Sequence, residues 1–588
     1  MINTLTDTAP TLIDQLYYLV PLGFLALWFS YERGLSLMMF FQQEEYDGPR
    51  FIKWLQQKRG YDKAASGWFL FAGILGALSH LLFAENMLMQ QMGPLLIPLI
   101  ILGFLHGIII SKRVRNNNKK PLVITTRVKR ILSVYLGLVV LDFSVISFLA
   151  SLAPKGEHYA LGVASNAESW FNTLTFSELA YNWQTVALAF LLIGLCQGLP
   201  ALLVLATKLL EPMEERLKAG FRNEAIEKFN RLKPKVIAIT GSFGKTSTKH
   251  ILSHILEAAA PSLATPGSVN TDMGITRVIR EQLKPEHQFF IVEMGAYGPG
   301  SIARLCKLTP PDVGLITAVG AAHYERFKSL ETVAKAKFEL AQATFTQGGN
   351  VVVNTDGIHP ALLAEQISNT PGNYCKVGTS GDVSLESCTQ TADGLTLQIQ
   401  DGNEAHTLKV PLYGAHQSGN ILLAAACAHS IGLPWAAIKG ALASVPQIRH
   451  RLEVSKNSSG PTLVNDAYNS NPVGFASALG CLNSLVGEGG RRILVTPGMV
   501  ELGTKHAEEH ETLGKLAAES CDIILVVTPA RIPTFLTGVQ KANNGKTTVM
   551  TFEKQQEAED WVTSNWKEAD VVLFENNLPD LYEATFSF

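Results

Sequence analysis

The stretch Val236-Ile-Ala-Ile-Thr-Gly-Ser-Phe-Gly-Lys-Thr-Ser-Thr-Lys249 decides the fold of the second half of the chain. It has the pattern of an apolar strand, a glycine turn and the first turn of a helix. In such a turn Gly241 and Gly244 let the backbone approach a ligand closely, and the amides of the helix N-terminus point at anionic oxygens. Lys245 can neutralise phosphate groups and the Thr246 hydroxyl can reach Mg²⁺. The stretch therefore predicts a phosphate loop, with the spacing Gly-x-x-Gly-Lys-Thr, which is shorter than the general one.

Downstream of this loop, short β-rich runs alternate with helical stretches, which predicts parallel α/β domains. The runs are residues 236–240, 289–293, 313–318, 351–354, 492–495, 523–527 and 571–574. Glu293 ends the second run, where a hard cation would find an oxygen ligand, and His323 follows the third. Both lie after the carboxyl end of a strand, which is where α/β sheets bind ligands.

Upstream of the loop, the composition changes. The chain has 588 residues, of which 47% are hydrophobic and only 17% charged, against roughly 25% charged in soluble domains. The deficit is concentrated in the first 210 residues or so, where five apolar segments approach or exceed the ~20 residues of a membrane helix. They are residues 12–31, 68–89, 94–110, 131–152 and 185–205. We therefore expect an α-helical membrane domain; the first segment is not a cleavable signal, since no Lys or Arg precedes Arg33.

The charges between these segments predict the orientation of the membrane domain. Loops 33–67 and 111–130 are rich in Lys and Arg, whereas loop 154–183 has Lys155 alone. The positive-inside rule places the first two loops in the cytoplasm and the third outside. The N-terminus is then outside and everything after about Lys208 is cytoplasmic. Four polar residues within the segments could serve either function or helix–helix contacts; they are His80, His106, Asp142 and Gln197.

Residues 211–235 connect the two parts and are rich in charge. Apolar residues recur there at helical intervals, which predicts an amphipathic helix that either lies on the membrane surface or docks on the soluble part. They are Leu217, Phe221, Ile226 and Phe229. The seven cysteines show no metal-ligand spacing, so we expect no disulfide and no zinc site. A net charge of −2 gives no reason to expect a nucleic-acid partner.

From about Lys235 to the C-terminus the sequence resembles the Mur ligases, the ATP-dependent amide-bond ligases of peptidoglycan synthesis. The likeness rests on nine blocks in family order. They are Thr240-Gly-Ser-Phe-Gly-Lys-Thr-Ser247, Thr265-Pro-Gly-Ser-Val-Asn-Thr-Asp-Met-Gly274, Glu293-Met-Gly-Ala-Tyr-Gly-Pro-Gly300, Ala322-His-Tyr-Glu-Arg-Phe327, Ala334-Lys-Ala-Lys-Phe-Glu339, Gly414-Ala-His-Gln-Ser-Gly-Asn-Ile-Leu-Leu-Ala-Ala425, His450-Arg-Leu-Glu453, Asp466-Ala-Tyr-Asn-Ser-Asn-Pro472 and Gly498-Met-Val-Glu-Leu-Gly503. The chain looks most like the members that add D-Ala-D-Ala to a UDP-linked muramyl tripeptide.

Together with the apolar segments and the charged linker, this resemblance divides the chain into four parts. They are a membrane domain at 1–209, an amphipathic linker helix at 210–234, a central ATP-binding domain with a phosphate-loop-type parallel sheet at 235–446, and a Rossmann-like C-terminal domain at 447–588. It also implies roles for single residues. ATP would be bound by Gly241, Ser242, Gly244, Lys245, Thr246, Ser247, Asn420, Arg451 and Asp466. Mg²⁺ would be bound by Thr246, Glu293, His323 and, once carbamylated, Lys337, for which Lys335 is a rival. Catalysis would depend on Lys245, His323, Lys337 and Arg451, and Asn270 and Thr271 would face the carboxylate substrate.

Two departures bear on the ligands. Where the family usually has His-Asn, this chain has His416-Gln417, a difference that affects the expected nucleotide contacts. Where the family usually has Asn-Asn, it has Asn270-Thr271, a difference that affects the expected substrate. In addition, the membrane segments stand where related ligases carry a domain that grips UDP. We therefore expect a membrane-anchored ligase that joins an amino acid or dipeptide to a cell-envelope precursor, in contact with membrane lipid and with other membrane-bound proteins of cell-wall synthesis. Alternatives are a poly-amino-acid synthetase of the poly-γ-glutamate kind, a silent assembly module and an ATP-driven transporter.

Overall fold

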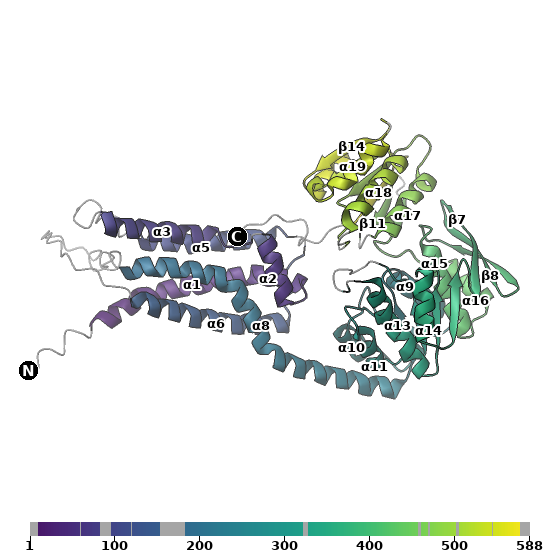
Figure 1. The fold of residues 1–588 in the computed structure, drawn as a ribbon, viewed down its shortest axis with the longest axis horizontal. Helices are drawn as coiled ribbons and strands as arrows, with labels where there is room; N and C mark the ends of the chain where they lie inside the picture. Colours follow the sequence, from purple (N-terminus) through teal and green to yellow (C-terminus); the bar gives the residue numbers. More distant parts are fainter. Residues whose placement is uncertain are drawn as a thin grey trace, which may run out of the picture. The chain divides into compact units, whose positions relative to one another are not determined.

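The computed structural model describes residues 10–58, 60–82, 96–118, 120–152, 183–320, 327, 329–456, 460–467, 471–500, 502, 505–543 and 545–576. The chain divides into two compact units between Glu215 and Arg216. In its described residues the first unit contains helices only, and the second contains two sheets covered by helices (Figure 1). Each unit is described by itself.

The first unit contributes six described helices, and all but the second overlap the apolar segments of the sequence. They are α1 (Pro10–Gln43), α2 (Gly48–Gln57), α3 (Ala64–Leu82), α5 (Leu96–Asn116), α6 (Thr126–Ser151) and α8 (Trp183–Leu232). All five predicted segments are helical over their described residues, in α1, α3, α5, α6 and α8, except that Leu152 lies just after the end of α6. Three of these helices, α5, α6 and α8, are long and apolar enough to cross a membrane.

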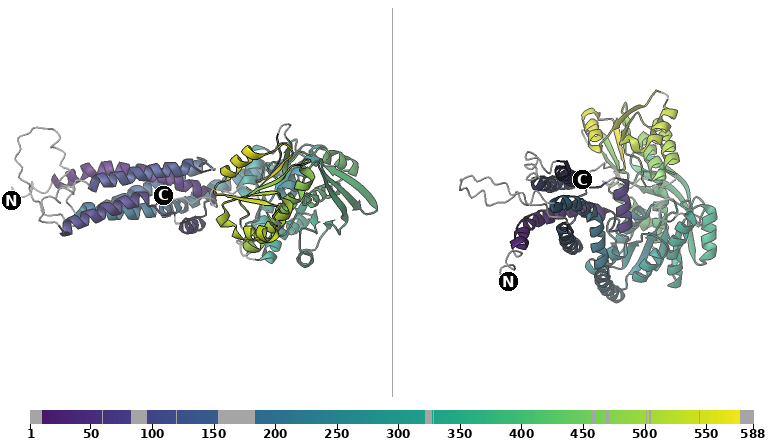
Figure 2. Two further views of the ribbon diagram at one scale, coloured as in Figure 1. Left: turned by 90° about the horizontal axis from the view of Figure 1, so that it is seen from above. Right: turned by 60° about the vertical axis from the view of Figure 1, so that its left-hand side comes forward.

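The long helices of this unit lie side by side (Figure 2). Their side chains are apolar both on the faces that pack together and on the outer faces. Inside, Phe104 of α5 contacts Phe29 of α1 and Phe69 of α3, with ring centroids 5.5 and 4.9 Å apart. Outside, Phe24 and Phe148 are 70% and 64% exposed. A helix that is apolar all round suits a membrane interior.

Polar residues within this bundle make contacts between helices. Gln197 donates from Nε2 to the carbonyl of Asp62 at 2.8 Å and to Ser66 Oγ at 2.9 Å. Trp68 Nε1 donates to His106 Nδ1 at 3.1 Å. For Gln197 and His106 the structure therefore favours helix–helix contact; the side chain of His80 lies outside the described residues.

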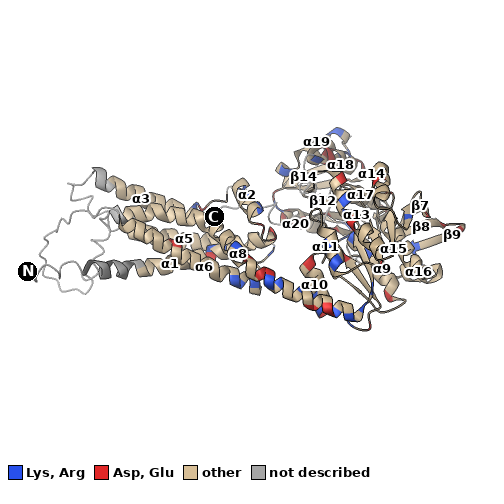
Figure 3. Ribbon diagram, turned by 60° about the horizontal axis from the view of Figure 1, so that its bottom comes forward, with Lys and Arg blue, Asp and Glu red and all other residues tan. Residues whose placement is uncertain are grey.

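Helix α8 runs without interruption from the last apolar segment through the linker, over 50 residues. Its second half carries the charged residues (Figure 3). Ala225 and Phe229 are buried in a core of the second unit, so the linker docks on the soluble part. The predicted apolar stripe is only partly covered, because Leu217 and Phe221 stay 40% and 39% exposed.

The second unit begins with a nine-stranded sheet in the order β2-β3-β1-β4-β5-β6-β7-β8-β9. The strands are β1 (Lys235–Thr240), β2 (Ser262–Ala264), β3 (Phe289–Glu293), β4 (Val313–Ile316), β5 (Asn350–Asn354), β6 (Tyr374–Gly378), β7 (Val383–Thr391), β8 (Gly394–Asp401) and β9 (Glu404–Val410). Pairs up to β6–β7 are parallel, and β7, β8 and β9 form an antiparallel ribbon.

Alternation along β1 divides the core between the two faces of this sheet. Ile237 and Ile239 belong to the core of α9 (Lys245–Glu257), α15 (Gln417–Ser430) and α16 (Trp435–Leu442). Val236 and Ala238 belong to the opposite core, which is lined by helices that follow β2, β3, β4 and β5. These are α10 (Asp272–Glu281), α11 (Ser301–Leu308), α13 (Leu330–Thr346) and α14 (Pro360–Asn369). With helices on both faces, the ligand-binding edge lies at the carboxyl ends of the strands.

A six-stranded sheet in the order β10-β11-β15-β12-β13-β14 completes the unit. Its strands are β10 (Glu453–Lys456), β11 (Thr462–Asp466), β12 (Arg492–Thr496), β13 (Ile523–Val527), β14 (Thr548–Phe552) and β15 (Val571–Glu575). Its helices are α17 (Pro472–Leu485), α18 (His506–Ser520), α19 (Pro533–Ala542) and α20 (Gln555–Asn565), with a short 3₁₀ turn, η4 (Pro529–Arg531). All seven predicted strands are present, and the predicted α/β class is confirmed.

Candidate functional site

The loop between β1 and α9 has the geometry of a phosphate cradle. Gly244 lies at the N-terminus of α9 with φ of 82°, a left-handed conformation that favours glycine. A Cβ on Gly244 would also lie 2.3 Å from Asn420 Oδ1, so a side chain is excluded there on two grounds. The first turn of α9 then presents its amides at the end of the strand, with Ser247 buried within that turn.

Two neighbouring elements hold this loop in place. The segment after β4 accepts two hydrogen bonds from Ser242 of the loop. The amide of Ser242 donates to the carbonyl of Ala318 at 2.8 Å, and its hydroxyl donates to the carbonyl of Gly320 at 3.1 Å. Helix α15 holds the loop through Asn420, whose Oδ1 accepts from Thr248 Oγ1 at 3.3 Å. Gln417 in turn accepts from Asn420 Nδ2 at 2.8 Å. The unusual glutamine therefore supports the loop through Asn420.

Glu293 at the end of β3 is the central acid of the site and is 1% exposed. Its Oε2 accepts from Thr246 Oγ1 at 3.0 Å and lies 2.9 Å from Lys249 Nζ. Its Oε1 accepts from Asn270 Nδ2 at 3.2 Å. Thr246, Glu293 and Asn270, far apart in the sequence, are thus brought together as expected from the adjacent parallel strands.

Lys245 lies in the loop with its ammonium on the carbonyls of Gly241 and Ser242, at 2.7 and 3.3 Å. Desolvation lowers the pKa of Lys245 to about 8; the charge of Glu293 opposes this shift and that of Arg451 adds to it. The amine therefore holds its proton at neutral pH but less firmly than a surface lysine.

Arg451 reaches the phosphate loop from the segment that leads into the second sheet. Its Nη2 donates to Thr246 Oγ1 at 3.4 Å. The residues on either side of it, His450 and Leu452, have φ of 59° and 50°. Left-handed backbone is uncommon at such residues and often marks functional sites. Asp466, at the end of β11, supports this turn because its Oδ1 accepts from the amide of Leu452 at 3.2 Å.

Sequence models of two domains match this part of the chain. The Mur ligase middle domain matches residues 239–428, and the glutamate ligase domain of Mur ligases matches residues 450–575. The chain contains the middle and C-terminal domains of the Mur ligases. Both matches lie in the second unit, and residues 1–238 lie outside them.

Relatives of the two Mur ligase domains are named UDP-N-acetylmuramoyl-tripeptide–D-alanyl-D-alanine ligase. The protein from Mycobacterium leprae is 33% identical over 308 residues, which are 48% of this chain and 59% of that protein. The protein from Escherichia coli is 32% identical over 295 residues, 50% of this chain and 64% of that protein. The chain therefore spans about three fifths of the length of these relatives.

Solved structures of MurF resemble the same domains. MurF from Thermotoga maritima, in complex with ADP, is 26% identical with a TM-score of 0.53, over 63% of this chain and 82% of that chain. MurF from Acinetobacter baumannii is 25% identical with a TM-score of 0.54, over 62% and 78% of the two chains.

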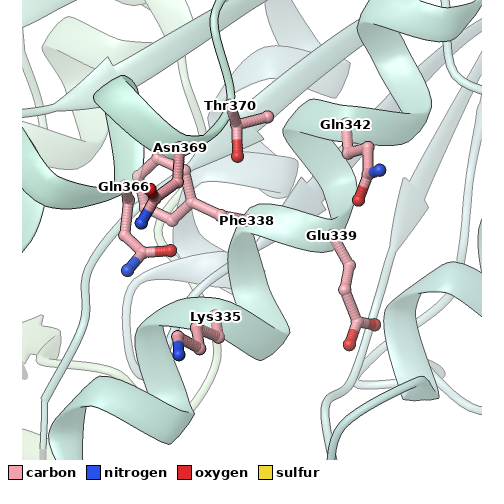
Figure 4. Close-up of a pocket in the computed structure, with 7 residues that line it drawn as sticks. All are labelled: Lys335, Phe338, Glu339, Gln342, Gln366, Asn369 and Thr370. Carbon is pink, nitrogen blue, oxygen red and sulfur yellow. The ribbon is translucent and has the colours of Figure 1, made fainter.

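The two rival lysines of α13 have different environments within the Mur ligase middle domain. Lys337 is 4% exposed, and no acid among the described residues pairs with it. Burial lowers the pKa of Lys337, and the nearby charge of Lys245 lowers it further. Lys335 is exposed and lines a surface cavity of about 360 Å³ between α13 and α14 (Figure 4). Only Lys337 thus faces the phosphate loop.

Two further predicted residues need comment. Thr271 caps α10, since its Oγ1 accepts from the amide of Gly274 at 3.3 Å, so its hydroxyl is engaged in the helix rather than with Glu293. His323 lies outside the described residues. The site also holds Lys249, which the sequence reasoning did not single out. It lies four residues after Lys245 and three after Thr246 in the helix, which places it on the same face.

Proposed function

We propose that the chain is a membrane-anchored, ATP-dependent amide ligase that acts through an acyl phosphate. The observation that carries this proposal is the meeting of the loop, Glu293 and Arg451 at Thr246. It supports a nucleotide site built jointly by both Mur ligase domains. The MurF relatives, one of them in complex with ADP, support the same assignment.

In the proposed reaction a substrate carboxylate attacks the γ-phosphorus of ATP, which gives an acyl phosphate and ADP. An amine then attacks the acyl carbon, loses a proton, and expels phosphate as the amide forms. Lys245 and the loop amides would hold the phosphate oxygens, and Arg451 would add positive charge from the C-terminal domain. Asn420 would keep the loop in shape, and Asp466 would fix the turn that carries Arg451.

The donor set fits Mg²⁺. The Thr246 hydroxyl and the Glu293 carboxylate lie 3.0 Å apart, and both are the hard oxygen ligands that this ion prefers. When bound there, Mg²⁺ would neutralise phosphate charge. His323 is a further proposed ligand. Gly241, Ser242, Gly244 and Ser247 would contribute backbone groups to the nucleotide.

For Lys337 we propose carbamylation. A buried lysine with a lowered pKa is available as a neutral amine, which can add CO₂ and release a proton to give a carbamate. The product is anionic and would neighbour the ammonium of Lys245, where burial of a charge needs an opposite partner. The carbamate would also supply an oxygen ligand to a second Mg²⁺.

The proposed substrates are an amino acid or dipeptide and a carboxylate of a cell-envelope precursor. Asn270, which contacts Glu293, would face that carboxylate, with Thr271 beside it. The three apolar helices that can cross a membrane support a precursor linked to lipid rather than to UDP. Repeated addition of amino acids, as in poly-γ-glutamate synthesis, is a second candidate, supported by the match to a glutamate ligase domain.

We further propose that the ligase domains lie on the cytoplasmic side of a bacterial inner membrane, with the N-terminus outside. The proposed division is a membrane domain at 1–209, a linker helix at 210–234, a middle domain at 235–446 and a C-terminal domain at 447–588. Membrane lipid and membrane-bound proteins of cell-wall synthesis are the proposed partners.

A turnover assay tests this function. The full chain, purified in detergent, is given ATP, Mg²⁺ and D-Ala-D-Ala with either UDP-N-acetylmuramoyl-tripeptide or its prenyl-linked counterpart. We expect ADP, phosphate and a product heavier by the dipeptide less water, with the prenyl-linked acceptor preferred. Preference for the UDP-linked acceptor would contradict the lipid linkage. Elongation by several identical residues would favour the poly-amino-acid reaction, and ADP formation without any amide would contradict both.

A further inference from the structure

We propose that an ion pair between Arg222 and Asp272 makes helix α8 a support of the substrate loop, which comprises residues 265–271. The helix that carries the last apolar segment would then set the position of this loop instead of serving as a passive tether. Arg222 is a positioning residue in this proposal, because it acts through Asp272. Its effect on catalysis rests on the function proposed above for Asn270 and Thr271.

Side chains from the second half of α8 and from α10 enter the same buried core. Ala225 and Phe229, one helical turn apart, are buried in the same core as Ile275 and Ile279 of α10. Ile226 also packs against this core. The two helices therefore share part of one core, and the direct links between them are the charged contacts at the two ends of α10.

Charged contacts add to this packing at both ends of α10. At its start, Arg222 Nη2 and Nε lie 2.5 and 3.2 Å from Asp272 Oδ2. At its end, Arg280 Nε donates to Glu224 Oε2 at 2.7 Å, and the carbonyl of Arg280 accepts from Lys228 Nζ at 2.8 Å. A two-nitrogen contact of Arg with a carboxylate fixes orientation as well as distance. The helix pair is therefore held at two points along its length.

Asp272 is the point where this support meets the substrate loop. It is the first residue of α10 and directly follows Thr271, the cap of that helix. One residue earlier, Asn270 donates to Glu293, and its carbonyl accepts from the amide of Gly295 at 2.9 Å. Near the start of the loop, Lys249 donates to the carbonyl of Gly267. The loop is thus held by the nucleotide site on one side and by α8 on the other.

Because α8 is one continuous helix, the ion pair between Arg222 and Asp272 connects that helix to the substrate loop. One helix runs from Trp183 to Leu232, so Arg222 lies on the helix that also carries the last apolar segment. A rotation or shift of α8 would therefore be felt at Asp272 and the loop. Pro212, within the helix, is the place where a bend would concentrate.

The test compares Arg222→Gln with Arg277→Gln in the full chain in detergent. Arg277 is the matched control because it forms an exposed ion pair with Glu281 within α10, at 2.9 Å, that does not involve α8. Amide hydrogen exchange, which needs no substrate, is expected to rise about five-fold at residues 270–275 in the first variant only, the change expected from loss of a partly buried ion pair. An unchanged rate, or the same rise in the control, would overturn the proposal.

Turnover provides the second readout, with whichever acceptor the wild-type chain uses. Arg222→Gln is expected to raise KM for that acceptor about five-fold and to leave KM for ATP within about two-fold. The swap Arg222→Asp with Asp272→Arg should restore most of the acceptor KM. An equal rise in both KM values, or no rescue by the swap, would indicate a merely structural role. If the wild-type chain turns over neither acceptor, the proposed function fails while the exchange result still decides the support by α8.

Discussion

The helical unit neutralises its buried acids with basic residues of the bundle, whereas the Mur ligase domains gather several cations around one buried acid at the phosphate loop. In the bundle, Arg33 pairs with Asp62, and Glu32 pairs with Arg115 at 2.8 Å. Around the phosphate loop, the charge of Glu293 acts on both Lys245 and Lys249, and Arg451 adds a third positive charge.

This difference separates structural charge from binding charge. The two charges of a buried ion pair neutralise each other, so the pair does not need a bound ligand. A buried site with surplus positive charge is costly until an anion enters it. Breaking a pair in the bundle should therefore reduce stability, whereas removing a cation from the site should reduce ligand binding and turnover while leaving stability unchanged or higher.

The largest effect is expected for Lys245→Met. In the proposed reaction this change removes the ammonium that would hold the transferring phosphoryl group, so kcat/KM for ADP release should fall about a thousand-fold. The melting temperature should stay the same or rise, because a buried charge is lost. Lys307→Met, at an exposed lysine of α11, is the control and should keep full activity. A large loss of stability in Lys245→Met would show that this lysine, too, is structural.

In the bundle the corresponding change is Arg33→Met, which leaves the carboxylate of Asp62 buried and alone. Removing one partner of such a pair costs about 3 kcal/mol of unfolding free energy. Denaturation in detergent, followed by the fluorescence of bundle tryptophans, measures the loss. Nucleotide binding should persist.

The double variant Arg33→Met, Asp62→Asn tests whether the cost comes from the orphaned charge. Asparagine keeps the oxygen that accepts from the amide of Ser66 at 2.8 Å. Stability should largely return in the double variant. If the single and double variants are equally unstable, the pair matters for packing and not for charge.

The next effect is expected for Lys337→Met, compared with Lys335→Met on the same helix. The buried position should lose about a hundred-fold in kcat, as expected for removal of an oriented charged group, and the exposed one almost nothing. Carbonyl-¹³C NMR with labelled bicarbonate should show a carbamate signal that Lys337→Met removes. Full activity of Lys337→Met would defeat the assignment.

The parts of this comparison differ in how far the sequence predicts them. Strands such as residues 289–293 were predictable, because apolar runs between helical stretches have few other solutions. The meeting of Thr246 and Glu293 was predictable too, since parallel strands bring their carboxyl ends to one edge.

Other features were not predicted from the sequence, for different reasons. Helix α8 continues past Lys208 because a change from apolar to charged residues does not end a helix when the charged residues are good helix formers. Lys249 looks like any helix lysine until Glu293 is placed beside it. The antiparallel ribbon of β7, β8 and β9 was not foreseen, and the capping role of Thr271 became visible only with the start of α10.

The smallest effect concerns pH and tests whether the surplus charge depends on Lys245. Its pKa of about 8 means that the free protein loses this charge as the pH rises through 8. ATP prefers the charged form, so affinity should be full below pH 8 and should fall about ten-fold between pH 7 and pH 9, as one titrating proton requires. Two groups near Arg451 titrate below this window: burial lowers the pKa of His416 to about 4 and raises the pKa of Asp466 to about 6. Binding of a fluorescent ATP analogue measures the slope, and Lys245→Arg, which keeps its charge, should flatten it. An equal slope in the arginine variant would mean that another group, such as Lys337, controls the charge of the site.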